Sequence, residues 1–210
     1  EGRGALIDVQ SEGFTRAFKR STELLDSTQP IFEAGFSAGG ALFFADVMLP
    51  DQLDGKKVWR MVEVKSSTSV KDYHRDDAAV QAFVAQAAGV PMQSISLAHI
   101  DSSWTYPGQD DYRGLLKEND LTEEAFSRSQ EVQSWIAQAQ IVVADLAEPA
   151  IKIGAHCDQP YACGFYNYCS RDEPKPEYPV YWLPRIGAKA AQLAEQGVTD
   201  LRNVADDLLN

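Results

Sequence analysis

Three strand-like runs, set close together, constrain the fold of this chain more than any other feature. They cover Ile31–Phe36, Ala41–Leu49 and Lys57–Lys65, and they are separated by Gly39-Gly40 and by the turn-forming stretch 51–55. Runs of this length, joined by short glycine-containing turns, pair with their chain neighbours as antiparallel strands. The sequence therefore predicts an antiparallel meander over residues 31–65.

Helical and strand patterns on both sides of the meander predict the other layers of the domain. Apolar residues recur at helical spacing over residues 12–26 and again over residues 76–88. A further strand is expected at residues 93–100. Capping residues at Asp120 and Glu123, followed by helical spacing up to Ala139, predict another helix. This order predicts an α/β fold in which helices flank a central mixed sheet.

Length and charge limit the class of protein. The 210 residues are enough for one sizeable core with a small appendage. A net charge of -12 counts against a protein that coats nucleic acid, because neutralisation of phosphates by basic side chains dominates such binding. It counts less against an enzyme, since a metal ion in a cleft attracts phosphate locally.

Targeting signals and the first residue add two expectations. The sequence contains no apolar run long enough to cross a membrane and no signal-peptide pattern, which predicts a cytoplasmic protein without a membrane segment. The chain starts at Glu1 rather than Met, so we expect a processed or excised piece of a longer chain, with possible further domains.

An aspartate inside one apolar run and a Glu-x-Lys on the next form the strongest candidate site. Asp46 lies in the otherwise almost wholly apolar run 41–49, where a carboxylate is costly unless it is paired or binds a cation. Glu63 and Lys65 end the following run, and side chains two residues apart share one face of a strand. If these faces align, Asp46 and Glu63 can hold Mg²⁺ with the Val64 carbonyl and water. Lys65 would then orient the attacking water in phosphodiester hydrolysis.

Less specific interpretations of these residues stay open. A Glu-x-Lys tripeptide is common by chance, so Glu63 and Lys65 could be a solvated pair and Asp46 the partner of an arginine. Glu33, on the preceding run, is a hypothetical further carboxylate of the same cleft, although a glutamate at a strand edge more often faces solvent. Three other polar residues are interpreted as loop residues outside the site: Asp72, His74 and His99.

The candidate residues resemble the PD-(D/E)XK nuclease superfamily, in particular its RecB-like exonuclease branch. The matching pieces are Ala45-Asp46, Glu63-Val64-Lys65 and Gln81, which lies in the helix after the lysine and is followed by an aromatic residue. The resemblance implies a restriction-endonuclease-like core in which Asp46 and Glu63 bind Mg²⁺ or Mn²⁺. It also implies that Lys65 assists catalysis and that Gln81 shapes the substrate side of the site. Two departures are Ala45 in place of proline and the lack of a histidine in the first helix.

The resemblance is closest to an uncharacterised bacterial branch of RecB-like nucleases. It implies a metal-dependent DNA exonuclease that acts in repair or defence. The rival class is a silent module that keeps the nuclease fold and only binds nucleic acid or a partner. The intact set of Asp46, Glu63 and Lys65 favours the enzyme. DNA or RNA as substrate, exonuclease or endonuclease action, and the oligomeric state stay open.

The cysteines of the chain, Cys157, Cys163 and Cys169, are concentrated in one aromatic-rich segment. Three closely spaced thiols argue against a disulfide framework and for thiolate ligation of an iron–sulfur cluster or Zn²⁺. Several RecB-like nucleases carry three such cysteines after the nuclease core and a fourth far upstream, so the resemblance implies a [4Fe-4S] cluster. Here the first gap is wider than usual and the upstream cysteine is absent, as in a chain truncated before it. Zn²⁺ and three unliganded thiols are the alternatives.

The end of the chain follows a proline-rich link at residues 171–179 and resembles a helix-hairpin-helix. In that motif a glycine hairpin offers backbone N–H groups to a DNA phosphate. Arg185 stands where the first hairpin glycine is usual, and a plain two-helix cap has the same periodicity. The expected organisation is a nuclease-like domain with its cysteine segment at residues 1–170, followed by the link and tail at residues 171–210.

Overall fold

The computed structural model describes residues 4–172, 175–187 and 189–205 of the chain. Their contacts form two compact units, Glu1–Asp145 and Leu146–Asn210. The boundary falls earlier than residue 170, where the sequence predicts it, and the cysteine segment belongs to the second unit. The physical reason is the stretch 145–154, which is almost wholly exposed and has little regular structure.

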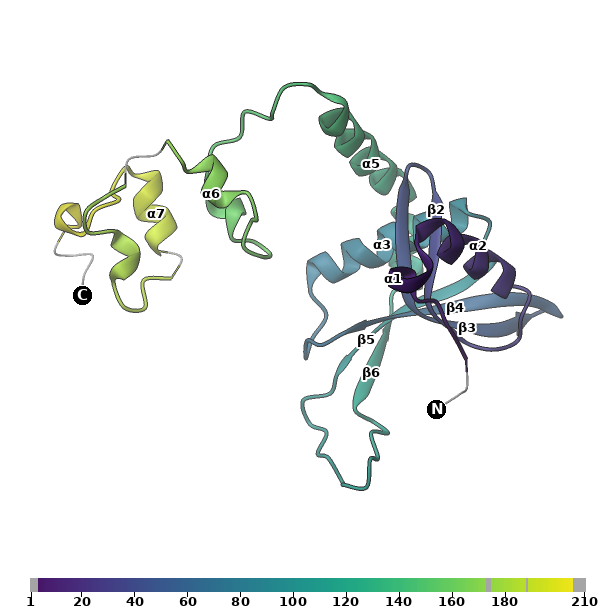
Figure 1. Cartoon of the computed structure of the whole chain (residues 1–210). Helices are drawn as coiled ribbons and strands as arrows, with labels where there is room; N and C mark the ends of the chain where they lie inside the picture. Colours follow the sequence, from purple (N-terminus) through teal and green to yellow (C-terminus); the bar gives the residue numbers. More distant parts are fainter. Residues whose placement is uncertain (1–3, 173–174, 188, 206–210) are drawn as a thin grey trace. The chain divides into compact units, whose positions relative to one another are not determined.

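A six-stranded mixed sheet forms the centre of the first unit, and its strands lie in chain order from β1 to β6 (Figure 1). The strands are Ala5–Leu6 (β1), Ile31–Ala38 (β2), Ala41–Leu53 (β3), Lys56–Lys65 (β4), Met92–Ile100 (β5) and Leu116–Asp120 (β6). β2, β3 and β4 are antiparallel neighbours, so the predicted meander is confirmed. β5 runs parallel to β4, β1 runs parallel to β2, and β6 is antiparallel to β5.

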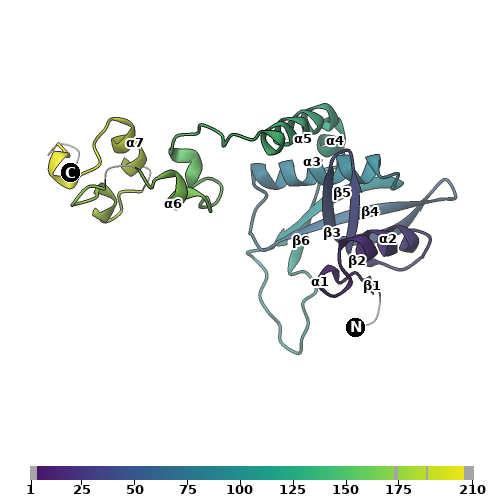
Figure 2. The ribbon, with the colours of Figure 1, turned by 45° about the horizontal axis from the view of Figure 1, so that its top comes forward.

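Helices cover this sheet and confirm the predicted α/β fold. The helices of the first unit are Val9–Glu12 (α1), Phe14–Leu24 (α2), Asp72–Ala87 (α3), Thr122–Ser127 (α4) and Ser129–Ala144 (α5). α2 packs on β2, whereas α3 connects β4 to β5 and packs on β2, β3 and β5. α4 and α5 pack on α3, which lies between them and the sheet in Figure 2.

Helix boundaries differ from the sequence prediction in several places. Gly13, with φ +76°, separates α1 from α2, so the helix predicted at residues 12–26 begins at Phe14. Asp120 ends β6 instead of starting a helix, and its carboxylate accepts a hydrogen bond from the Thr122 N–H (N to Oδ1 2.8 Å) where α4 begins. The long helix predicted from there is interrupted at Arg128, between α4 and α5.

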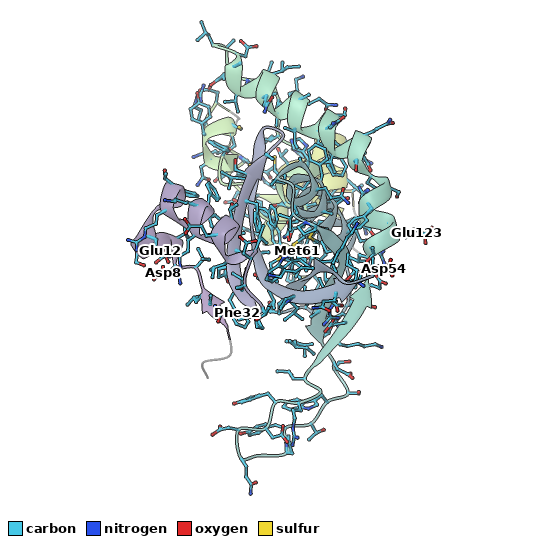
Figure 3. All side chains as sticks on the ribbon, turned by 90° about the vertical axis from the view of Figure 1, so that its right-hand side faces the viewer. Asp8, Glu12, Phe32, Asp54, Met61 and Glu123 are labelled. Atoms are coloured by element: carbon cyan, nitrogen blue, oxygen red, sulfur yellow. The ribbon has the colours of Figure 1, made fainter. Side chains whose placement is uncertain are left out.

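Large apolar side chains fill the space between the sheet and the helices. Trp59, Met48 and Met61 are fully buried, and Figure 3 shows Met61 in the middle of the packed region. The buried face of α3 is mostly small, which lets the helix approach the strands closely; its alanines are Ala78, Ala79, Ala82 and Ala85. The polar members of this face, His74 and Gln81, are therefore held against the sheet.

The second unit contains short helical turns and a small apolar core. Its elements are Ala155–Cys157 (η1), Tyr166–Cys169 (α6), Val180–Trp182 (η2), Lys189–Glu195 (α7) and Leu201–Asn203 (η3). Val180, Leu193 and Val204 form the core. Where the sequence resembles a helix-hairpin-helix, the described residues form a 3₁₀ turn on each side of α7, and Ala188 lies outside the described residues. Nowhere in the described parts of the chain is a helix long and apolar enough to cross a membrane.

Candidate active site

β3 and β4 separate at the candidate site. They are paired from Leu53↔Lys56 to Val47↔Val62, and the next residues of β4 pair with β5. Asp46 on β3 and Glu63 on β4 are the first residues beyond the last pair. The Asp46 carboxylate reaches across and accepts a hydrogen bond from the Val64 N–H (N to Oδ2 2.6 Å). The end of the pairing therefore brings two carboxylates together at one point of the sheet.

Lys65 joins these strands to helix α3. Its ammonium group donates to Glu63 (Nζ to Oε1 2.7 Å) and to Asp77 (Nζ to Oδ2 2.5 Å). Asp77 also accepts a hydrogen bond from the Gln81 amide (Nε2 to Oδ1 3.3 Å), one helical turn further along α3. Burial lowers the pKa of Lys65, but its hydrogen bonds with Asp77 and Glu63 outweigh burial and hold this pKa above its ordinary value. The lysine is therefore a fixed cation between strand and helix.

The sequence reasoning missed Asp77. It precedes Gln81 by four residues, and residues at this spacing lie on the same face of a helix. That spacing was the only available signal, because the ion pair with Lys65 depends on how α3 folds back over β4.

Glu63 is the most buried carboxylate of the site. Its side chain is 7% exposed, and within the described residues its Oε2 atom has no hydrogen-bond partner. Burial raises the pKa of Glu63, the Lys65 and Gln81 side chains partly offset this, and the charge of Asp46 raises it again. A buried carboxylate oxygen without a donor is unfavourable. Such an oxygen is an acceptor that a bound cation can satisfy.

Glu33 lies beside the same site on β2. The pairing of β2 with β3 omits Glu33 and Asp46, which lie between the pairs Phe32↔Val47 and Ala34↔Ala45. Glu33 has φ +58°, an unfavourable region for a residue with a side chain, and such strain is concentrated at functional sites. Burial and the charge of Asp46 raise the pKa of Glu33. The structure thus brings Glu33 close enough to Asp46 for their charges to interact.

A divalent cation fits this site by its donor chemistry. The described residues contain no group of three His, Cys, Asp or Glu side chains already arranged as metal ligands. Mg²⁺ does not require one, because it is commonly held by one or two carboxylates and keeps several waters. Asp46 and the unpartnered Oε2 of Glu63 are the two carboxylates available, with the backbone of Val64 next to them.

Three polar residues were wrongly interpreted as loop residues: Asp72, which begins α3, and two histidines. His74 is buried in the first turn of α3, where its Nδ1 accepts the Lys71 N–H at 3.1 Å. His99 is buried on β5, opposite Lys65 in the strand register. Burial, followed by the charge of Lys65, lowers the pKa of His74. The error at Asp72 and His74 arose because α3 begins earlier than its apolar periodicity indicates. His99 lies within the strand that the sequence predicts at residues 93–100.

The three cysteines lie in the second unit and differ in exposure. Cys157 is buried, whereas Cys163 and Cys169 are exposed and not in disulfides. The Cys163 N–H donates to the Cys157 carbonyl (2.7 Å), which closes a turn between the first two thiols. Four aromatic side chains of this segment are exposed: Tyr161, Phe165, Tyr166 and Tyr168. The donor chemistry suits a metal, but the described residues do not gather three such ligands.

Comparisons with known proteins do not identify a family or a function for this chain. No protein-family model matches this chain, and no curated protein matches it. The crystal structure of SSO0001 aligns with 63% of this chain and 58% of its own, at 14% identity and a TM-score of 0.29. A likeness this weak carries no argument about fold or function.

Proposed function

We propose that this protein is a metal-dependent nuclease that hydrolyses DNA phosphodiester bonds with Mg²⁺ or Mn²⁺, built on a PD-(D/E)XK-like core. The observation that carries the proposal is the buried Oε2 atom of Glu63, without a partner among the described residues, next to Asp46 and joined through the other oxygen to Lys65. The element order α2–β2–β3–β4–α3–β5, with β4 parallel to β5, supports the same core.

Each residue of the site has a distinct part in this chemistry. Asp46 and Glu63, assisted by the Val64 carbonyl, would hold the cation, and Glu33 would be a further carboxylate of the same site. When bound, the cation supplies positive charge against the scissile phosphate and lowers the pKa of the attacking water. Lys65 donates to the charged oxygens of the phosphate as the transition state forms. Water adds to phosphorus, one P–O ester bond breaks, and the leaving oxygen takes up a proton.

Gln81 and Asp77 act from α3. Asp77 places a second carboxylate on the Lys65 ammonium group, beside that of Glu63, and so helps to hold the lysine in position. Gln81 is held by Asp77 and has a buried Oε1 atom that lacks a partner in the described structure. In this proposal Gln81 shapes the substrate side of the site from its fixed place on α3.

The test is cleavage of end-labelled DNA by the whole chain and by Asp46→Asn, with Mn²⁺ and with EDTA. Asp51→Asn is the matched control, since Asp51 lies exposed on the same strand. We expect metal-dependent cleavage by the parent and by Asp51→Asn, and none by Asp46→Asn. The labelled products then distinguish exonuclease from endonuclease action. Cleavage that persists in Asp46→Asn would contradict the assignment, and a parent that binds DNA without cleaving it would establish the silent binding module instead.

We further propose that Cys157, Cys163 and Cys169 ligate a [4Fe-4S] cluster with a structural role in the second unit. The support is that the three thiols and four exposed aromatic side chains lie in one segment. This segment is outside the small core of Val180, Leu193 and Val204. No step of the hydrolysis is assigned to the cluster. Metal analysis of protein purified without oxygen tests this: we expect brown, iron-containing protein that Cys157→Ser renders colourless. Zinc in colourless parent protein would establish the alternative site.

A further inference from the structure

The loop between β5 and β6, residues 101–115, carries three aromatic side chains that cluster outside the core. The ring centroids of Tyr106 and Tyr112 are 5.4 Å apart with their planes at 23°, and Trp104 lies 5.9 Å from Tyr106 and 6.4 Å from Tyr112. Tyr106 is 48% and Tyr112 58% exposed. The loop extends away from the sheet in Figures 1 and 2. We call residues 101–115 the aromatic loop.

Hydrogen bonds give the aromatic loop a defined shape. The Trp104 indole N–H donates to the Arg113 carbonyl (3.0 Å), and the Tyr106 hydroxyl accepts the Asp110 N–H (2.9 Å). At the base of the loop, the Asp101 N–H donates to the Leu115 carbonyl (2.9 Å). The rings are therefore presented by a folded loop, and little conformational entropy is lost when a ligand binds them.

The aromatic loop leaves the sheet at the same end as the candidate active site. β5 is the parallel neighbour of β4, and His99 is paired with Lys65 in their register. One residue later, the Ile100 N–H donates to the carbonyl of Ser67 (2.9 Å), which follows the end of β4. The loop therefore begins one strand away from Lys65.

The charge of the aromatic loop favours a single strand over duplex DNA as its ligand. Its carboxylates are Asp101, Asp110 and Asp111, and its one arginine, Arg113, is paired with Asp111 (Nη2 to Oδ2 2.6 Å). Such a surface gains little from phosphates, which dominate the affinity for duplex DNA. Exposed aromatic faces instead stack on bases, and only a single strand has unpaired bases to offer.

We propose that the aromatic loop is a base-stacking platform for single-stranded DNA, which delivers the strand to the candidate active site. The inference rests on the proposed nuclease function and adds the substrate class: a single strand, held next to the scissile phosphate by its bases. Tyr112 is the principal contact, because it is the more exposed of the two stacked tyrosines and lies beside a shallow hollow that also involves Gln109 and Arg113.

The first experiment measures binding of fluorescein-labelled oligothymidine to the whole chain in the Asp46→Asn background with EDTA, so that no strand is cleaved. Tyr112→Leu keeps an apolar side chain but removes the ring, and we expect it to weaken binding about tenfold. Tyr112→Phe keeps the ring and is expected to bind like the parent. Phe14→Leu, at an exposed aromatic residue of α2, is the control and is expected to change nothing.

Two further comparisons separate the outcomes. A blunt duplex of the same length is expected to bind more weakly and to be insensitive to Tyr112→Leu. Unchanged binding of oligothymidine by Tyr112→Leu, equal loss in Tyr112→Phe, or equal loss for the duplex would each overturn the platform. This binding experiment does not depend on cleavage, so a parent that fails to cleave DNA refutes the nuclease alone. A parent that cleaves while Tyr112→Leu keeps both full binding and an unchanged KM refutes the platform alone.

Discussion

The two units of this chain are stabilised in different ways. Residues 4–145 bury a continuous set of large side chains between a sheet and its helices, with Trp59 and Met61 fully enclosed. The described residues beyond Asp145 form a much smaller core around Val180, Leu193 and Val204. Apolar burial is the dominant stabilising contribution in folding. The first unit therefore owes its fold to its own side chains, whereas the cysteine segment of the second exposes its aromatics.

The same difference separates the two groups of candidate functional residues. Asp46, Glu63 and Lys65 lie at the edge of a packed core, where the surrounding strands and α3 hold them in place. Cys157, Cys163 and Cys169 lie on short turns with few buried neighbours. We infer that the first site is built before its metal binds, while the second depends on its ligand for structure.

The largest effect is expected from Lys65→Met, which tests whether the chemistry belongs to the first unit. The substitution keeps the length of the side chain but removes the charge that faces the phosphate in the proposed mechanism. We expect the rate of DNA cleavage to fall about a thousandfold or more, measured under single-turnover conditions. Lys152→Met, at an exposed lysine of the second unit, is expected to leave the rate unchanged. Equal losses of cleavage rate in both variants would contradict the assignment of the chemistry to the first unit.

Two tryptophans sharpen the difference in packing. Trp59→Ala opens a cavity in the core of the first unit and should lower the free energy of unfolding by about 3–5 kcal/mol, measured with denaturant. Trp182 is 59% exposed in the second unit, and Trp182→Ala should change that free energy by no more than about 0.5 kcal/mol. Equal destabilisation by the two substitutions would show that burial does not explain the difference in stability between the two units.

Asp77→Asn tests whether α3 positions Lys65, the lysine of the proposed mechanism. Loss of the ion pair leaves Lys65 less fixed, so we expect cleavage to slow about ten- to a hundredfold, mainly in kcat. Asp76→Asn is the neighbouring control, because Asp76 pairs with Arg128 (Nη2 to Oδ1 2.6 Å). An unchanged kcat in Asp77→Asn, or the same loss in Asp76→Asn, would remove Asp77 from the site. Restoration of kcat in Asp77→Glu would indicate a positioning role.

Glu63→Gln is expected to have the smallest effect on stability, with a definite pH dependence. The folded protein raises the pKa of Glu63 above its ordinary value of 4.5, so the folded chain keeps this proton to higher pH than the unfolded chain does. The stability that protonated Glu63 contributes is therefore present below pH 4.5 and is lost as the pH rises through the raised pKa.

Glutamine stays neutral at every pH, so metal-free Glu63→Gln should be more stable than the parent at about pH 8 and nearly equal to it at about pH 4. Denaturant unfolding in EDTA at both values measures the difference. Lower stability of the variant at the higher pH would mean that the ion pair with Lys65 outweighs the burial of Glu63.

Local patterns were sufficient for the centre of the fold. Strand-like apolar runs and glycine-containing turns predicted β2, β3 and β4 to within a few residues, because both are properties of neighbouring residues. The edge strands β1 and β6 were missed. β1 spans only Ala5–Leu6, and β6, Leu116–Asp120, is largely polar, so pairing with a neighbouring strand decides both.

The candidate site divides in the same way. The sequence alone predicted Asp46, Glu63 and Lys65 and their positions on successive strands. A carboxylate in an apolar run is unfavourable unless it is paired or binds a cation, so it indicates a site. The convergence of these side chains, the ion pair of Lys65 with Asp77 and the burial of His74 and His99 required the tertiary structure. They depend on where β3 separates from β4 and on how α3 crosses from β4 to β5. Such contacts join residues far apart in the chain, whose approach only the packing of the whole core decides.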